Sequence, residues 1–209
     1  MAAPAVLAAA ELRRGDDAML PPTLLRHPAF TAANTTAGIR NLCTLGTLFV
    51  LMLFLQSVQH RSALLAGLTV VPLCAPLAVV APVGGRITSR FGPPRLPAAS
   101  GLLVAASGLA LLTRSGAQSG YADLLSAFLR WEIGCGLLTP AVVAAAIATA
   151  PAERSGLASA VNNTARQMGG AIGIAVAGAV AGQPGDQARF LRGFHAVALG
   201  TACLYAAVP

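Results

Sequence analysis

The sequence predicts an all-α membrane protein with about six transmembrane helices. Apolar residues make up 56% of the chain and charged residues only 10%, against roughly 25% charged in an average soluble protein. The apolar excess recurs along the whole chain, in uncharged stretches close to the ~20 residues that a helix needs to cross a bilayer. Short turns containing arginine, glycine or proline separate these stretches. A soluble domain of this size would need far more charge to cover its surface.

Each element follows from this pattern. Residues 1–31 are expected to form a lead-in on the cytoplasmic side, because Pro21-Pro22 and His27-Pro28 interrupt any continuous helix. The expected six-span bundle, residues 32–209, has spans at about residues 32–56, 63–83, 96–113, 123–150, 155–181 and 190–208. The second span is expected to be a kinked helix because it contains three prolines, namely Pro72, Pro76 and Pro82.

Arginine placement predicts the orientation. The loop Gly84–Arg95 carries three arginines between two uncharged stretches, and such clusters stay on the cytoplasmic side. With this loop inside, the inner segments hold seven arginines and the outer segments four. We therefore expect a multi-pass protein of the cell (inner) membrane with both termini in the cytoplasm and the lipid bilayer as its environment.

Several function classes are disfavoured. The net charge of +7 does not indicate nucleic-acid binding, because the arginines lie singly or in threes between apolar runs. The sequence contains no GxSxG, Walker or HExxH motif, so we do not expect an enzyme. The cysteines lie alone in apolar stretches, without metal-ligand spacing, and we expect no metal or cofactor. They are Cys43, Cys74, Cys135 and Cys203.

Charged side chains inside the expected spans are the candidates for a transport pathway, because each costs about 2.5–3.5 kcal/mol at a helix centre. Helix geometry places Glu132 and Arg166 at similar depth, which suggests an ion pair between them. Alternatively, Arg130 and Glu132 extend outward to the membrane surface, or the expected span edges are misplaced. Glu132 is also the one candidate for carrying a proton within a span. Arg40 is a further pathway candidate.

The fifth span contains both polar and small residues. Asn162 and Asn163 can hydrogen-bond to another helix or meet a polar substrate, and the sequence leaves both uses open. Four glycines follow, in two pairs at four-residue spacing, and such faces favour close helix packing. A sliding surface for a conformational cycle is the alternative. The glycines are Gly169, Gly173, Gly178 and Gly182.

Three segments resemble the major facilitator superfamily, specifically the C-terminal half of its fourteen-span drug:proton antiporter branch. Leu25–Asn34 is similar to the lead-in to the ninth span of that branch, and Ser155–Gly173 to the thirteenth span and the turn before it. The segment between Gly85 and Arg95 resembles the cytoplasmic loop motif of the superfamily. The motif residues here are Gly85, Arg86, Arg90, Gly92 and Arg95.

The resemblance implies proton-coupled efflux of drugs or other amphipathic small molecules by a secondary transporter. It also implies a substrate cavity between two six-span halves, of which this chain supplies one. A complementary N-terminal half is therefore one candidate partner, beside the small-molecule substrate and protons. The alternative is a truncated, non-transporting module, or half of a split transporter that needs a partner chain. Ser89 occupies the loop-motif position where the superfamily usually has aspartate, which favours the alternative.

Overall fold

The computed structural model of the chain describes residues 26–90, 95–116, 118–148 and 154–207, and these form helices and short connections without a strand. In chain order the helices are α3 (Pro28–Leu53), the π-helix η2 (Phe54–Val58), α4 (Ala63–Val70), the 3-10 turn η3 (Val71–Leu73), α5 (Cys74–Arg90), α6 (Arg95–Leu112), α7 (Tyr121–Ala148), α8 (Ser155–Ala181) and α9 (Gln187–Ala207).

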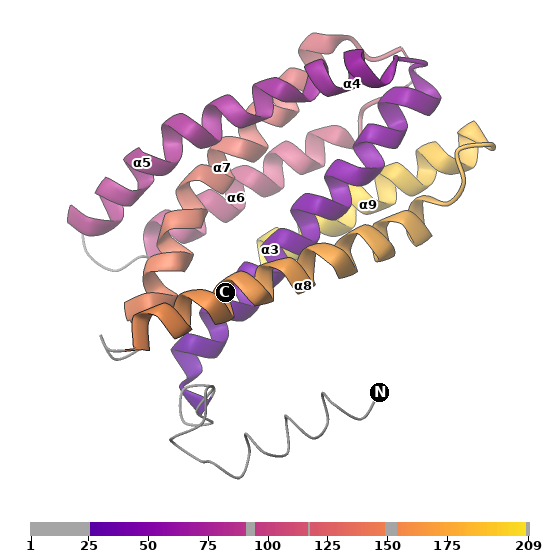
Figure 1. The fold of residues 1–209 in the computed structure, drawn as a ribbon. Coiled ribbons are helices and arrows are strands. Elements are labelled where there is room, and N and C mark those ends of the chain that lie inside the picture. The colour runs from indigo at the N-terminus through magenta and orange to yellow at the C-terminus, as the bar shows by residue number, and fades with distance from the viewer. Residues whose placement is uncertain (1–25, 91–94, 117, 149–153, 208–209) are drawn as a thin grey trace, which may run out of the picture.

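The long helices form one bundle (Figure 1). Helix α3 lies along α8, α6 lies along α7, and α5 packs on the other side of α7. Helix α9 contacts α6, α8 and α3. Between them, helices α3 and α7 therefore contact α5, α6, α8 and α9. The sides of α3 and α7 that face each other lie in the interior of the bundle.

The helices begin where the sequence offers the appropriate caps. Pro28 starts α3 at a position where its missing N–H costs nothing. The Ser62 hydroxyl caps α4 by accepting a hydrogen bond from the Leu65 amide at 3.3 Å. The Asp186 carboxylate accepts one from the Arg189 amide at 3.0 Å, at the first turn of α9.

The expected kink in the second apolar segment is present. Helix α4 gives way to the 3-10 turn η3 around Pro72, and α5 follows, since proline removes a backbone donor and clashes with the preceding turn. The loop expected at Gly84–Arg95 does not begin at Gly84, because α5 continues to Arg90; residues 91–94 lie outside the described residues. Its glycines serve packing: a β-carbon on Gly84 would lie 3.1 Å from the carbonyl oxygen of Gly136 in α7.

Aromatic side chains fill one end of the interior. Phe54 of η2 stacks on Phe194 of α9, with ring centroids 4.7 Å apart. Phe128 and Trp131 of α7 are fully buried in the same core. This end of the bundle is held together by ring packing, whereas the middle contains the polar groups described below.

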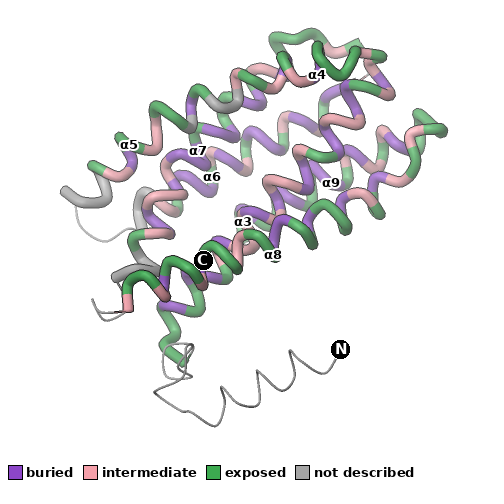
Figure 2. Tube along the Cα trace, viewed as in Figure 1, coloured by how far each residue is buried: buried purple, intermediate pink, exposed green. Residues whose placement is uncertain are grey.

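The outer surface is apolar. Large exposed aliphatic side chains run along α4 and α5 and along α8 (Figure 2), which suits lipid or another protein surface better than water. They include Leu64, Leu65, Leu68, Val71, Val79 and Val83, and Met168, Ile172, Val176 and Val180.

Among the described residues, three helical segments are long and apolar enough to cross a membrane: Pro28–Val58, Tyr121–Ala144 and Gln187–Ala207. Ala98–Leu112 is a shorter apolar helix. The chain therefore has an all-α membrane fold, as predicted. Among the described residues, the helical segments begin and end within about four residues of the expected spans, except that α5 runs to Arg90, seven residues beyond the expected end of the second span. How many of them cross the bilayer remains a prediction.

Candidate functional site

A chain of polar groups crosses the middle of the bundle from α3 to α7. The Arg40 guanidinium donates through Nη1 to the Thr139 hydroxyl at 2.9 Å. Thr139 in turn donates to the Cys135 carbonyl, one turn earlier in α7, at 2.6 Å. Arg40, expected as a pathway residue, is thus fixed against α7 by a hydrogen bond to a neutral group.

Tyr205 of α9 contacts polar groups of α3 and α7, which together with it form a polar cluster. The sequence analysis did not identify this residue. Its ring is buried, and its hydroxyl lies 3.1 Å from the Thr44 hydroxyl and 3.5 Å from the Cys135 sulfur. The hydroxyl also donates to the Arg40 carbonyl at 3.4 Å. The available signal was a tyrosine in the apolar last two turns of α9, because a buried phenol usually finds a partner.

Glu132 is buried in α7, with 6% of its surface exposed. In the part of the chain that the structure describes, no basic group lies within ion-pair distance of its carboxylate; Arg40 is the cation whose charge acts on it. Glu132 precedes Thr139 by seven residues, about 10 Å along the helix axis. Its carboxylate is therefore two turns away from the Arg40–Thr139 hydrogen bond, on the same face of α7.

The expected ion pair between Glu132 and Arg166 does not form. Asn41 of α3 donates to the Arg166 carbonyl at 2.7 Å, which places Arg166 at the depth of Arg40 and Thr139. The depth estimate was wrong because α7 has 28 residues, about 42 Å, and exceeds a core of about 30 Å. Counting from its end therefore misplaced Glu132.

Arg166 is half-buried, and its Nε has no hydrogen-bond partner in the structure. The charge of Arg40 acts on Arg166 as well as on Glu132. The site thus combines two guanidinium groups and one carboxylate within an apolar bundle, and none of them forms an ion pair with another described residue. Such groups inside a membrane bundle are typical of substrate or proton pathways.

Asn162 and Asn163 have different roles. Asn162 is buried and donates to the Asn34 side chain of α3 at 3.1 Å, while Asn34 donates to the Phe30 carbonyl at 2.8 Å. Asn163 is exposed. Of the two uses that the sequence left open, helix-to-helix bonding therefore applies to Asn162, and Asn163 stays available for a substrate or another surface.

This difference gives a matched test. Asn162→Ala should lower the stability of the bundle by about 0.5–2 kcal/mol, because it removes an interhelical hydrogen bond and leaves the Asn34 oxygen without this donor. Asn163→Ala should leave stability unchanged. The midpoint of thermal unfolding in detergent checks both variants, and equal effects would contradict the assigned roles.

The glycines of α8 mediate close packing on α3. A β-carbon on Gly169 would overlap the Gly38 carbonyl, and one on Gly173 would overlap the carbonyl of Leu42. One on Gly178 would meet the Phe49 ring at 3.2 Å.

Gly182 was expected to pack as well, and this is wrong, because nothing lies within 4 Å of its β-carbon position. It ends α8 with φ = +73°, a conformation that favours glycine.

The loop-motif residues extend from the end of α5 to the start of α6. Gly85 and Arg86 lie within α5, Arg90 ends it and Arg95 begins α6. Gly92 lies outside the described residues. In the described ranges, no group of three or more His, Cys, Asp or Glu side chains could hold a metal ion.

The family model of the Major Facilitator Superfamily matches residues 6–174. The chain is 32% identical over 176 residues to a methylenomycin A resistance protein of Streptomyces coelicolor, covering 84% of this chain and 37% of that protein. It is 33% identical over 175 residues to a tetracycline resistance determinant of Streptomyces rimosus, covering 82% of this chain and 50% of that protein.

A multidrug resistance protein, Stp, of Mycobacterium tuberculosis is 32% identical over 168 residues, or 80% of this chain and 31% of that protein. The chain spans between about a third and a half of the length of these curated relatives. Among solved structures, a peptide transporter POT has a similar fold, with a TM-score of 0.66 at 19% identity over 85% of this chain and 37% of that one.

Proposed function

Because the chain belongs to the major facilitator superfamily, we propose that it is part of a secondary transporter that exports drugs or other amphipathic small molecules across the cell membrane. In this proposal the chain forms the C-terminal half of a fourteen-span drug:proton antiporter. It crosses the inner membrane six times, and the connection between α5 and α6 and both termini lie in the cytoplasm.

One observation carries the proposal. Glu132 is buried in the bundle, Arg40 and Arg166 are half-buried, and none of the three has an ion pair among the described residues. A bundle with only a structural role gains nothing from such groups, because each one is costly in a membrane interior. A transporter needs them, since a polar substrate or a coupled proton must find partners along its path.

The relatives support the substrate class. Those compared above are named for resistance to methylenomycin A, to tetracycline and to multiple drugs. A further relative, of Streptomyces glaucescens, is named a tetracenomycin C resistance and export protein. We infer from these names that this chain also acts on such organic molecules. Separately, we propose protons as the coupled ion and Glu132 as the residue that carries them, because Glu132 is a buried carboxylate.

A second candidate is a module that transports only with a partner chain. Transporters of this kind bind substrate between two repeats that rock against each other, and this chain covers half or less of the relatives' length. The exposed aliphatic side chains of α4, α5 and α8 could then face the complementary half.

One experiment tests both proton-coupled transport and the need for a second half. The purified chain is reconstituted in proteoliposomes under an imposed pH gradient, with and without a complementary N-terminal half taken from a relative, and the flux of a fluorescent cationic dye is measured. We expect gradient-driven flux only with both halves present. Flux with the chain alone would contradict the need for a partner, and no flux in either case would contradict proton-coupled drug transport.

A further inference from the structure

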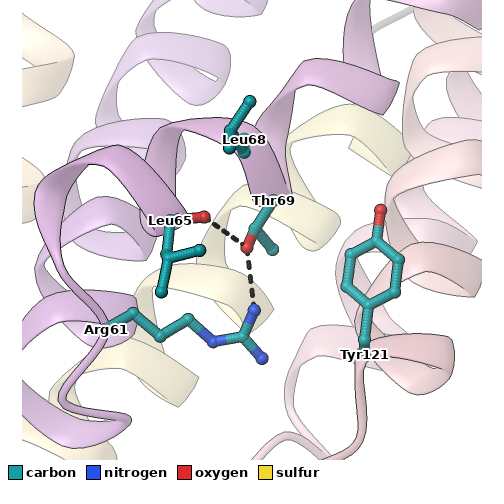
Figure 3. Close-up of a pocket in the computed structure, with 5 residues that line it drawn as sticks. All are labelled: Arg61, Leu65, Leu68, Thr69 and Tyr121. Carbon is teal, nitrogen blue, oxygen red and sulfur yellow. Dashed lines mark hydrogen bonds between the residues drawn. The ribbon is translucent and has the colours of Figure 1, made fainter.

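A second polar site lies at one end of the bundle, away from the central cluster. A pocket of about 350 Å³ is lined by Arg61 from the turn before α4, by Leu65, Leu68 and Thr69 of α4, and by Tyr121 at the start of α7 (Figure 3). It lies at the end of the bundle opposite the last turn of α5 and the first turn of α6 (Figure 1).

Arg61 is held in place by the α4 helix. Its Nη1 donates to the Thr69 hydroxyl at 2.8 Å, and this hydroxyl donates to the Leu65 carbonyl at 2.7 Å. Thr69 is buried, with 6% of its surface exposed, so the contact point is fixed by the fold. One edge of the guanidinium is therefore anchored before any ligand arrives (Figure 3).

The charge of Arg61 has no counterion in the described part of the chain. No carboxylate there lies within 4 Å of the guanidinium, and only Nη1 takes part in a side-chain hydrogen bond. A guanidinium with free N–H groups in a fixed plane matches the oxygens of a phosphate, which it can bind through two parallel hydrogen bonds.

The rest of the pocket is suited to hydrocarbon. Leu65 and Leu68 are each 56% exposed beside the guanidinium, and Tyr121 is 41% exposed on the opposite wall. Tyrosine is enriched where a membrane helix meets the headgroup layer, and Tyr121 is the first residue of α7. The site thus presents a cation and a phenol at the headgroup level, next to exposed leucines.

We propose that this pocket binds the headgroup phosphate of an anionic phospholipid, with the acyl chains lying over Leu65 and Leu68. Inorganic phosphate offers the same oxygens but would leave the two leucines uncovered, so the lipid is the ligand that uses the whole pocket. With the orientation proposed above, the lipid belongs to the outer leaflet. Binding requires no transport and does not depend on the proposed drug efflux.

Native mass spectrometry of the full chain released from detergent tests the site, because it resolves the binding of individual lipids. The chain is titrated with phosphatidylglycerol or with phosphatidylcholine, and the first dissociation constant is measured for each. We expect tighter binding of phosphatidylglycerol. Arg61→Gln should weaken its binding about fivefold, since a basic residue near an anionic membrane surface contributes about 1 kcal/mol, and leave phosphatidylcholine unchanged.

Arg114→Gln is the matched control. Arg114 is an exposed arginine in the connection between α6 and α7, at the same end of the bundle, and it does not line the pocket. This variant should keep the full preference for phosphatidylglycerol, whereas Arg61→Lys, which retains the charge but not the planar guanidinium, should keep only part of it. An equal loss in Arg114→Gln, or no preference in the unchanged protein, would overturn the proposal. Displacement of the lipid by excess inorganic phosphate would assign the pocket to free anions instead.

Discussion

Gly169→Ala is expected to destabilise the protein strongly, although alanine is the better helix former. The added β-carbon would overlap the carbonyl of Gly38 in α3, and a backbone atom within a packed helix cannot move aside as a side-chain end can. Overpacking typically costs about 1–3 kcal/mol. This cost exceeds the gain of about 1 kcal/mol that alanine brings to a helix interior. The midpoint of thermal unfolding in detergent should therefore fall.

Gly156→Ala provides the control on the same helix. Gly156 lies in the first turn of α8, is exposed, and has nothing within 4 Å of its β-carbon position. This substitution should leave the midpoint unchanged or raise it. A Gly169→Ala protein as stable as Gly156→Ala would show that α3 and α8 are free to separate, and would favour the sliding surface over fixed packing.

Glu132→Gln is expected to abolish flux driven by a pH gradient, with a loss of about tenfold or more in proteoliposomes that contain both halves. Glutamine has nearly the same shape and is neutral, so it keeps the packing of α7 but cannot take up or release a proton. Glu132 is buried, and Arg40 is the positively charged residue that acts on its carboxylate electrostatically. Buried carboxylates inside membrane bundles commonly serve as proton relays. Dye binding without a gradient should persist.

Asp123→Asn is the matched control, because Asp123 is an exposed carboxylate in the first turn of the same helix. It should retain gradient-driven flux. If Glu132→Gln also retains it while the protein stays folded, Glu132 does not carry the coupled proton. If both dye binding and flux are lost, Glu132 has a structural role or contacts the substrate.

Sequence patterns predicted the positions of the helices well, but they predicted the contacts between helices poorly. The expected boundaries 155–181 coincide with those of α8, because Pro151 and Gly182 bracket an uninterrupted helical pattern. The kink at Pro72 was equally predictable. The predicted loop at Gly84 was wrong, because two adjacent glycines indicate a turn in a sequence, whereas here Gly84 allows α5 to approach α7.

In the candidate site, too, the sequence identified the charged residues but not the residues that they contact. Arg40, Glu132 and Arg166 could be identified because charge is conspicuous in an apolar helix. Their partners could not, since Thr139, Thr44 and Tyr205 are unremarkable in the sequence. Even Asn162 and Asn163, neighbours of identical type, differ in burial, and only their positions around the helix decide which one reaches Asn34.

By itself, the sequence determined that this protein is a bundle of apolar helices and which of its residues are costly to bury. These properties depend on the composition of local segments, which a linear chain displays directly. Only the tertiary structure decided that Asn41, not Glu132, contacts Arg166, that Tyr205 closes the polar cluster, and that Arg61 meets Thr69 at the bundle end. Such pairings depend on the rotation and depth of each helix relative to its neighbours, which packing across the whole bundle sets.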